Sequence, residues 1–454
     1  MAVWLAQWLG PLLLVSLWGL LAPASLLRRL GEHIQQFQES SAQGLGLSLG
    51  PGAAALPKVG WLEQLLDPFN VSDRRSFLQR YWVNDQHWVG QDGPIFLHLG
   101  GEGSLGPGSV MRGHPAALAP AWGALVISLE HRFYGLSIPA GGLEMAQLRF
   151  LSSRLALADV VSARLALSRL FNISSSSPWI CFGGSYAGSL AAWARLKFPH
   201  LIFASVASSA PVRAVLDFSE YNDVVSRSLM STAIGGSLEC RAAVSVAFAE
   251  VERRLRSGGA AQAALRTELS ACGPLGRAEN QAELLGALQA LVGGVVQYDG
   301  QTGAPLSVRQ LCGLLLGGGG NRSHSTPYCG LRRAVQIVLH SLGQKCLSFS
   351  RAETVAQLRS TEPQLSGVGD RQWLYQTCTE FGFWDTDPWH VLSVTQALGS
   401  SESTLLIRTG SHCLDMAPER PSDSPSLRLG RQNIFQQLQT WLKLAKESQI
   451  KGEV

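Results

Sequence analysis

Residues 178–197 read PWICFGGSYAGSLAAWARLK, and this stretch decides the fold. The apolar run at 178–182 is short enough for a buried strand. Residues 189–197 contain good helix formers in an amphipathic spacing. Ser185 therefore lies on a predicted strand-to-helix turn, with glycines just before it. A turn of this kind lifts a serine hydroxyl above the sheet, where a general base can activate it as a nucleophile.

The motif around Ser185 nearly fits G-x-S-x-G, because GGSYA has alanine in the last position. A structural Gly-Ser turn is the alternative interpretation. A serine hydrolase of this kind has its acid and then its histidine further along the chain. Asp387 and His412 follow in that order, His412 just after a predicted strand. Each alone would be an ordinary turn or surface residue, but together they predict a Ser-His-Asp triad. The amides of Tyr186 and Gly101 are the expected oxyanion donors.

Composition indicates a globular chain that enters the secretory pathway. Of 454 residues, 46% are hydrophobic and 15% charged, and the net charge of +4 gives no basic footprint for nucleic acid. An apolar stretch at residues 11–21, followed by Ala22-Pro23-Ala24, predicts a signal peptide over residues 1–24. The alternative is a short membrane anchor, although the run is shorter than the ~20 residues of a span.

The remaining chain divides by texture into four further parts. Residues 25–57 are rich in Gly, Ser, Gln and Ala and predict a pro-segment or a flexible arm. Strand-like and helix-like runs alternate over 58–213, which predicts an α/β architecture with a parallel sheet. Residues 214–384 read as helix after helix, an inserted helical cap, and 385–454 return to α/β texture. The individual elements expected in the α/β parts are strands at 94–99, 124–129, 178–182, 203–207 and 403–408, and helices at 147–171, 189–197 and 432–445.

Sequons and cysteines agree with an oxidising, secretory environment. The sequons predict glycosylation at Asn70, Asn172 and Asn321. Eight cysteines are compatible with disulfides, of which Cys181 is expected to be a free thiol in a core strand. No C-x-x-C pair suggests zinc, and neither a metal nor a cofactor is expected.

Several motifs together resemble one serine peptidase family, that of lysosomal prolyl carboxypeptidase and dipeptidyl peptidase II. The resemblance runs from about Trp61 to the C-terminus, and its motifs are GSY at 184–186, EHRFYG at 130–135, QTCTEFG at 376–382, DPW at 387–389 and GSH at 410–412. It implies an α/β-hydrolase domain with a helical cap, Ser185 as nucleophile, Asp387 as orienting acid and His412 as base. It also implies a peptidase that trims peptides in endosomes or lysosomes, and family members favour proline before the cut bond.

The chain departs from the family pattern before the acid. After the QTCTEFG motif, Phe383-Trp384 run directly into Asp385-Thr386-Asp387, so a buried strand and several tens of residues are expected to be missing. This shortening puts the position of Asp387 and a disulfide partner for Cys378 in doubt.

Three functions follow from these observations. The first is a serine exopeptidase acting on peptides, without nucleic-acid partners or a membrane span. The second is an esterase or lipase on the same scaffold, which the triad alone does not exclude. The third is a binding protein derived from a damaged hydrolase. Substrate sequence, disulfide pairing and oligomeric state are not readable from the sequence.

Overall fold

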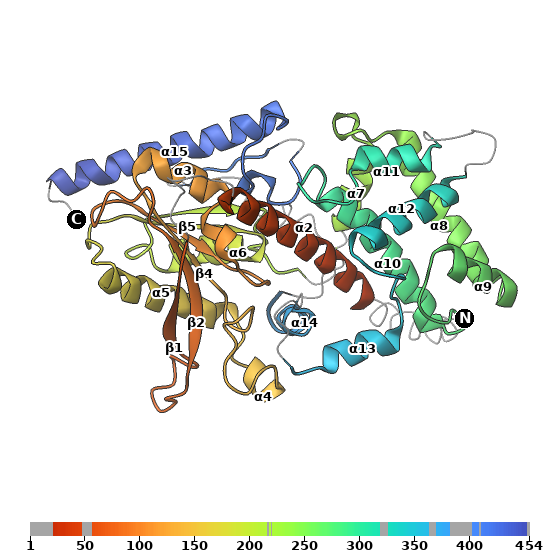
Figure 1. The fold of residues 1–454 in the computed structure, drawn as a ribbon, viewed down its shortest axis with the longest axis horizontal. Helices are drawn as coiled ribbons and strands as arrows, with labels where there is room; N and C mark the ends of the chain where they lie inside the picture. The colour runs from red at the N-terminus through yellow and green to blue at the C-terminus, as the bar shows by residue number, and fades with distance from the viewer. Residues whose placement is uncertain are drawn as a thin grey trace, which may run out of the picture. The chain divides into compact units, whose positions relative to one another are not determined.

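The computed structural model describes residues 21–47, 57–215, 218, 220–317, 326–362, 369–381, 402–407 and 410–451. Two compact units are distinguished within them (Figure 1). The sheet unit is built from Gln36–Leu216, Thr361–Phe383 and the C-terminal part of the chain. The helical unit is built mainly from Asp217–Ser360.

The sheet unit is organised around six strands in the order β1-β2-β4-β3-β5-β6. Strands β3, β4, β5 and β6 run parallel, whereas β1 pairs antiparallel with β2 and β2 pairs antiparallel with β4. The sheet is therefore mixed, and the expectation of a parallel sheet holds for its last four strands only. The bounds are β1 Lys58–Leu65, β2 Ser76–Asn84, β3 Ile95–Leu99, β4 Leu125–Leu129, β5 Trp179–Gly184 and β6 Ala204–Ser208.

Short apolar runs predict β3, β4 and β5 correctly, because these three parallel strands are covered on both faces. Phe96, Ile127 and Ile180 are all fully buried. Side chains of β3, β4 and β5 pack against Leu438 and Leu442 of α15, so this long helix covers one face of the sheet. Helices of the sheet unit are α3 His114–Trp122, α4 Met145–Leu148, α5 Ser153–Leu170, α6 Tyr186–Lys197, α14 Asp370–Gln376 and α15 Pro425–Lys451.

The expected strand at 403–408 is wrong for the residues that can be described. Residues 402–407 have an irregular backbone, and Leu405 and Leu406 are exposed. A strand forms only where a neighbouring strand satisfies its backbone N–H and C=O groups. Among the described residues no strand pairs with 402–407, and the sheet ends at β6.

The helical unit contains the expected run of helices, although its C-terminal boundary differs from the prediction. Residues 361–383 belong to the sheet unit rather than to the cap. Gln372 on α14, for example, donates a hydrogen bond to the Phe133 carbonyl over 3.0 Å. Helices of the helical unit are α7 Glu220–Leu229, α8 Leu238–Arg256, α9 Gly259–Glu268, α10 Ala278–Gln297, α11 Val308–Leu315, α12 Pro327–Ser341 and α13 Arg351–Arg359.

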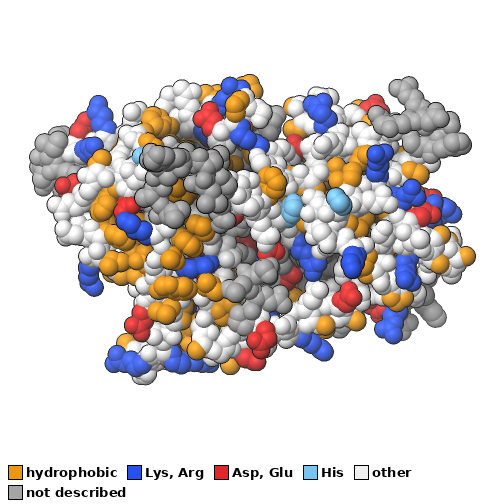
Figure 2. Space-filling model, in the orientation of Figure 1, with side chains coloured by type: hydrophobic (Ala, Val, Ile, Leu, Met, Phe, Trp, Pro, Cys, Tyr) orange, Lys and Arg blue, Asp and Glu red, His pale blue; other side chains and the backbone are white. Residues whose placement is uncertain are grey.

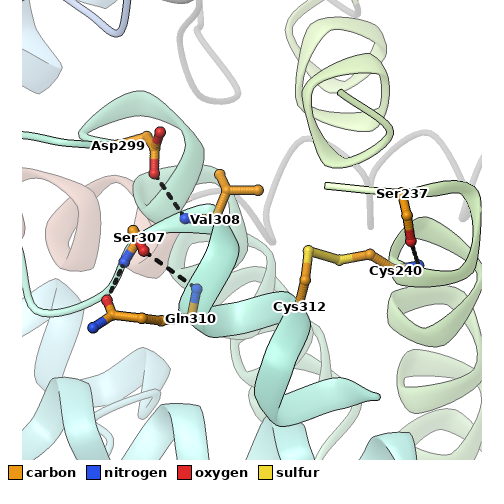
Figure 3. The surroundings of a disulfide bond; sticks show 7 residues. All are labelled: Ser237, Cys240, Asp299, Ser307, Val308, Gln310 and Cys312. Carbon is orange, nitrogen blue, oxygen red and sulfur yellow. Dashed lines mark hydrogen bonds between the residues drawn. A yellow bond between two sulfur atoms is a disulfide. The ribbon is translucent and has the colours of Figure 1, made fainter. Parts of the chain in front are cut away.

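Two disulfides brace the helical unit. Cys240 of α8 is bonded to Cys312 of α11, and Cys272 is bonded to Cys346 (Figure 3 shows the first pair). Both helices of the first pair have capped N-termini, since Ser237 accepts from the Cys240 amide and Ser307 forms a capping box in α11. Cys240 in the first turn of α8 and Cys312 in the middle of α11 are therefore carried on helices whose N-termini are capped.

A helix replaces the flexible arm that was expected after the signal peptide. Helix α2 spans Leu21–Leu47, and Leu26, Leu30 and Ile34 on it are buried. Apolar side chains spaced three or four residues apart give this segment a helical face to bury. Its role as a pro-segment stays a prediction. None of the helices in the described residues has the length and hydropathy to span a membrane.

The β1–β2 hairpin carries exposed apolar side chains at the edge of the sheet. Val59, Trp61 and Leu65 of β1 and Leu78 of β2 are all about half exposed or more. Figure 2 shows hydrophobic side chains at the surface of this part of the molecule. The alternation of exposed and buried residues along β1 is the pattern of a strand with one solvated face.

Candidate active site

The backbone around Ser185 has the geometry of a sharp strand-to-helix turn. β5 ends at Gly184, α6 begins at Tyr186, and Ser185 between them has a φ of 59°. A non-glycine residue at positive φ is costly and is found where the surrounding structure enforces it, often at active sites. A Cβ at Gly183 would lie 2.1 Å from the Ala187 carbonyl oxygen, so only glycine fits before the turn. The amide of Ser185 donates to the Ser208 carbonyl over 2.9 Å, which ties the turn to the end of β6.

The loop after β3 lies beside this turn, as expected for an oxyanion hole. A Cβ built on Gly101 would lie 3.3 Å from the Ala187 amide nitrogen, which places Gly101 against the first turn of α6. The hydroxyl of Ser185 points toward the Glu102 carboxylate, with 3.4 Å between the two oxygens. Amides at a helix N-terminus lack intrahelical acceptors and favour negative charge. The roles of Tyr186 and Gly101 as donors remain predictions.

Glu130 of the EHRFYG motif binds the loop that follows β3 and contains Gly101. The Glu130 carboxylate is fully buried and accepts hydrogen bonds from the guanidinium of Arg80 over 2.7 Å and from the Leu105 amide over 3.0 Å. It also accepts from the Leu136 amide and the Ser137 hydroxyl. A buried carboxylate needs this number of donors. Glu130 therefore anchors the loop that carries Gly101 to the end of β4.

The turn that carries His412 packs directly against the nucleophile turn. A Cβ on Gly184 would lie 2.8 Å from Cys413 Sγ, so the residue after His412 touches the residue before Ser185. The Cys413 amide donates to the Ser209 hydroxyl over 3.0 Å. Burial lowers the pKa of His412 to about 3, which keeps its imidazole neutral and able to accept a proton. The structure thus brings the predicted serine and the loop of the predicted base together.

His131 has a different environment from a catalytic base. Its Nδ1 is 2.6 Å from the Arg132 carbonyl oxygen and its Nε2 is 2.9 Å from the Tyr186 hydroxyl. Nδ1 therefore carries the proton, and Nε2 accepts from Tyr186. Burial lowers the pKa of His131 to about 4. Both ring nitrogens are thereby engaged away from Ser185, as expected for a residue that shapes the site.

Several buried contacts at the site could not be identified from sequence spacing. Arg132 forms a two-pronged ion pair with Asp159 of α5, both contacts being 2.6 Å, and the pair is buried. The Tyr186 ring packs edge-on against Phe381, with centroids 5.2 Å apart. Glu380 accepts from the amide and hydroxyl of Ser153 at the start of α5. In the sequence, Arg132, Tyr186 and Glu380 stand out only because they belong to the family motifs, and nothing there indicates which residues they contact.

The QTCTEFG motif is anchored on the sheet unit up to Phe381. The Tyr134 hydroxyl donates to Gln376 Oε1 over 2.7 Å, which joins this motif to EHRFYG. Cys378 is exposed and has a free thiol. The prediction for Cys181 is confirmed, since it is a buried free thiol whose pKa burial raises to about 12.

The remaining predicted site residues divide between exposed and undescribed positions. Asn70 and Asn172 are exposed, as a glycosylation site requires. The Asn172 side-chain amide donates to Gln91 over 3.1 Å. Asp387 and Asn321 lie outside the described residues, so their predicted roles stay predictions.

Comparison with known proteins finds closely similar serine proteases. The chain is 88% identical to a thymus-specific serine protease of Homo sapiens, covering 100% of both chains. It is 70% identical to a protein of the same name from Mus musculus, covering 98% of this chain and 99% of that protein. A lysosomal Pro-X carboxypeptidase of Mus musculus is 28% identical, over 73% of this chain and 66% of the relative. Among solved structures, an arylesterase matches with 16% identity over 40% of this chain and 54% of its own, at a TM-score of 0.24.

The alignments also support a missing segment before Asp387. The alignment to the human relative spans 514 positions, and this chain has 454 residues, so at least 60 positions have no residue here. The family model "Serine carboxypeptidase S28" matches residues 64–386 and 384–434, two stretches that meet where the missing strand is expected. With a sharp strand-to-helix turn at Ser185 on a mixed sheet, this chain has an α/β-hydrolase fold. It belongs to the S28 serine carboxypeptidase family and is a serine peptidase.

Proposed function

We propose that this chain is a serine exopeptidase that trims peptides in the endosomal and lysosomal pathway through Ser185, His412 and Asp387. The observation that carries the proposal is the packing of Cys413 on Gly184, because it puts the His412 turn beside the Ser185 turn. Motifs 227 residues apart are brought to one point by two elements that each have a strained backbone, Ser185 with a φ of 59° and Cys413 with a φ of 53°.

In the first half of the reaction, Ser185 Oγ attacks the carbonyl carbon of the scissile peptide bond. His412 takes the hydroxyl proton as the new C–O bond forms, and the carbonyl oxygen becomes an oxyanion. The amides of Tyr186 and Gly101 donate hydrogen bonds to that oxyanion. His412 then gives its proton to the leaving amine, the C–N bond breaks, and an acyl-enzyme on Ser185 remains.

Water completes the cycle by the same groups in reverse. His412 takes a proton from the water as its oxygen attacks the acyl carbon, and returns that proton to Ser185 Oγ as the ester bond breaks. Asp387 holds the imidazole in the tautomer that this requires. Burial around His412 favours the neutral form, so the base is available in an acidic compartment.

Active-site labelling tests the assignment of the nucleophile. We expect Ser185→Ala to abolish covalent labelling by a fluorophosphonate while secretion and the melting temperature stay close to those of the parent. A variant that still labels would place the nucleophile elsewhere. The turnover of a library of peptides, with and without proline before the cut bond, is then compared with the turnover of a panel of acyl esters. Faster turnover of acyl esters would favour an esterase on the same fold.

A second candidate is a catalytically impaired binding protein, and the irregular backbone of 402–407 favours it. The strand expected to carry the acid is missing from this chain, and residues 402–407 have no pairing partner among the described strands. A misplacement of ~1 Å in a catalytic group can cost 10²-fold in rate. Restoring the segment of at least 60 residues should therefore raise peptide turnover and the melting temperature. Equal values for the two forms would show that the segment is dispensable.

A further inference from the structure

Two consecutive serines at the end of β6, Ser208 as its last residue and Ser209 just after it, contact both halves of the proposed active site. The carbonyl oxygen of Ser208 accepts from the Ser185 amide over 2.9 Å, and the hydroxyl of Ser208 donates to the Asp415 carboxylate. The hydroxyl of Ser209 accepts from the Cys413 amide over 3.0 Å. One short segment thus binds the turn of the nucleophile through its backbone and the turn of the base through its side chains.

We propose that Ser208, Ser209 and Asp415 form a positioning device, the serine clamp, that sets the distance between Ser185 and His412. The inference rests on the proposed function, because it assumes His412 as the base. None of the three residues touches the reacting atoms in this scheme. Each acts by fixing the backbone on which a reacting group is carried.

Backbone strain at the clamp indicates that its geometry is enforced. Ser185, Ser209 and Cys413 all have positive φ, at 59°, 46° and 53°. Left-handed backbone in non-glycine residues costs free energy and persists where neighbouring contacts hold it. Here the three strained residues are joined to one another through Ser208 and by the Ser209–Cys413 hydrogen bond. Loss of a clamp contact therefore allows the His412 turn to relax.

The far side of the clamp is held by an arginine of α15. Arg431 donates to the carbonyl oxygens of Asp415, Leu414 and Ala417 over 2.9–3.0 Å, and its Nη1 contacts the Asp423 carboxylate at 2.6 Å. The backbone of Asp415 is thereby fixed by Arg431, and its carboxylate accepts the hydrogen bond from the Ser208 hydroxyl. Burial raises the pKa of Asp415, and the Ser208 hydrogen bond and Arg431 act in the opposite direction. The Ser208 hydroxyl is thus one of the groups that favour the charged form of this carboxylate, against the effect of burial.

The test compares two clamp variants with a matched control in the same sheet. Ser208→Ala removes the donor to Asp415, and Ser209→Gly removes the acceptor for Cys413 while tolerating positive φ. Ser128→Ala is the control, because Ser128 is a buried serine of β4 whose hydroxyl lies 2.6 Å from that of Ser109. Each of the three variants loses one hydrogen-bonded hydroxyl, and only the first two act on the His412 turn.

Hydrogen exchange decides the proposal without requiring activity. We expect the Cys413 amide to exchange about 10-fold faster or more in both clamp variants than in the parent and the control. Fluorophosphonate labelling of the folded protein should slow by about 10- to 100-fold in the clamp variants only. Unchanged exchange at Cys413 in both clamp variants would overturn the proposal.

A double variant separates the clamp from the proposed function. If the clamp acts through His412, Ser208→Ala should have no further effect on labelling in a His412→Gln background. An equal loss in both backgrounds would show that Ser208 acts through something else and would overturn the clamp. If His412→Gln alone labels as fast as the parent, the assignment of the base fails, while the exchange measurement still tests the contact.

Discussion

Acidification should destabilise this fold by several kcal/mol, because the fold lowers the pKa of four histidines, His98, His114, His131 and His412. His114 and His131 are each 3% exposed, and burial lowers the pKa of both side chains to about 4. The folded pKa lies below the unfolded value of 6.5, so the unfolded chain binds the proton first. Stability is therefore complete above pH 6.5 and is lost as the pH falls from there toward 4.

The size of the effect follows from the pKa shift. One unit corresponds to about 1.4 kcal/mol, so at pH 5 each histidine removes roughly 2 kcal/mol and the pair roughly 4 kcal/mol. A domain has only about 5–15 kcal/mol in total. The buried carboxyls of Asp159 and Asp415 have raised pKa values and act in the opposite sense, because protonation on acidification relieves their burial.

Urea unfolding at pH 7 and pH 5 measures this difference directly. The double variant His114→Gln/His131→Gln should be less stable than the parent at pH 7 but should lose about 4 kcal/mol less on going to pH 5. His200→Gln is the matched control, because His200 is exposed and its loss should leave the difference between the two pH values unchanged. If the double variant and the parent lose the same free energy between pH 7 and pH 5, the two histidines are not the cause.

Three further predictions concern single contacts. His412→Gln should lower fluorophosphonate labelling at least 100-fold and His131→Gln much less; loss of labelling in His131→Gln alone would reverse the assignment of the base. Tyr186→Phe should cost about 1–3 kcal/mol in urea unfolding, because Nε2 of buried His131 loses its donor, and an unchanged midpoint would contradict that hydrogen bond. Replacing Cys240 and Cys312 together by alanine should cost about 2–5 kcal/mol, because the bond closes a loop with a sequence separation of 72. The control uses proteins in which the other disulfide is also replaced by alanine, and calorimetry compares the Cys240/Cys312 form after reduction with the form in which these two cysteines are alanine. If their melting temperatures differ, the loss comes from packing rather than from the cross-link.

The sequence predicts the parallel strands well and misses the antiparallel hairpin of β1 and β2. β3, β4, β5 and β6 are found within one or two residues of their expected bounds. For β3, β4 and β5 the reason is that a parallel strand covered on both faces is a continuous apolar run in the sequence. β1 and β2 were missed, since their polar and apolar residues alternate and Gly60 interrupts β1. The run at 403–408 has the composition of a strand, but composition does not show whether a neighbouring strand is present to pair with it.

The candidate site shows the same division between local and long-range information. Ser185 and the glycines around it are readable from spacing alone, because the turn is built within one short stretch of chain. The Ser208–Asp415 contact joins residues 207 positions apart and has no sequence signal. The same holds for Glu380, which caps α5 from 227 residues away.

The exposed apolar residues of the β1–β2 hairpin have a consequence for handling the protein. Among the described strands, β1 lies at the edge of the sheet and has no neighbour on its outer side. Edge strands of this kind pair with other molecules unless something shields them. The hairpin turn adds Phe69 and Val71, which are 54% and 87% exposed, on either side of the sequon residue Asn70. A glycan at Asn70 would cover this tip with a hydrated, bulky group. Protein made in a host without N-glycosylation, or as Asn70→Gln, is therefore expected to aggregate through this edge at concentrations where the glycosylated form stays in solution.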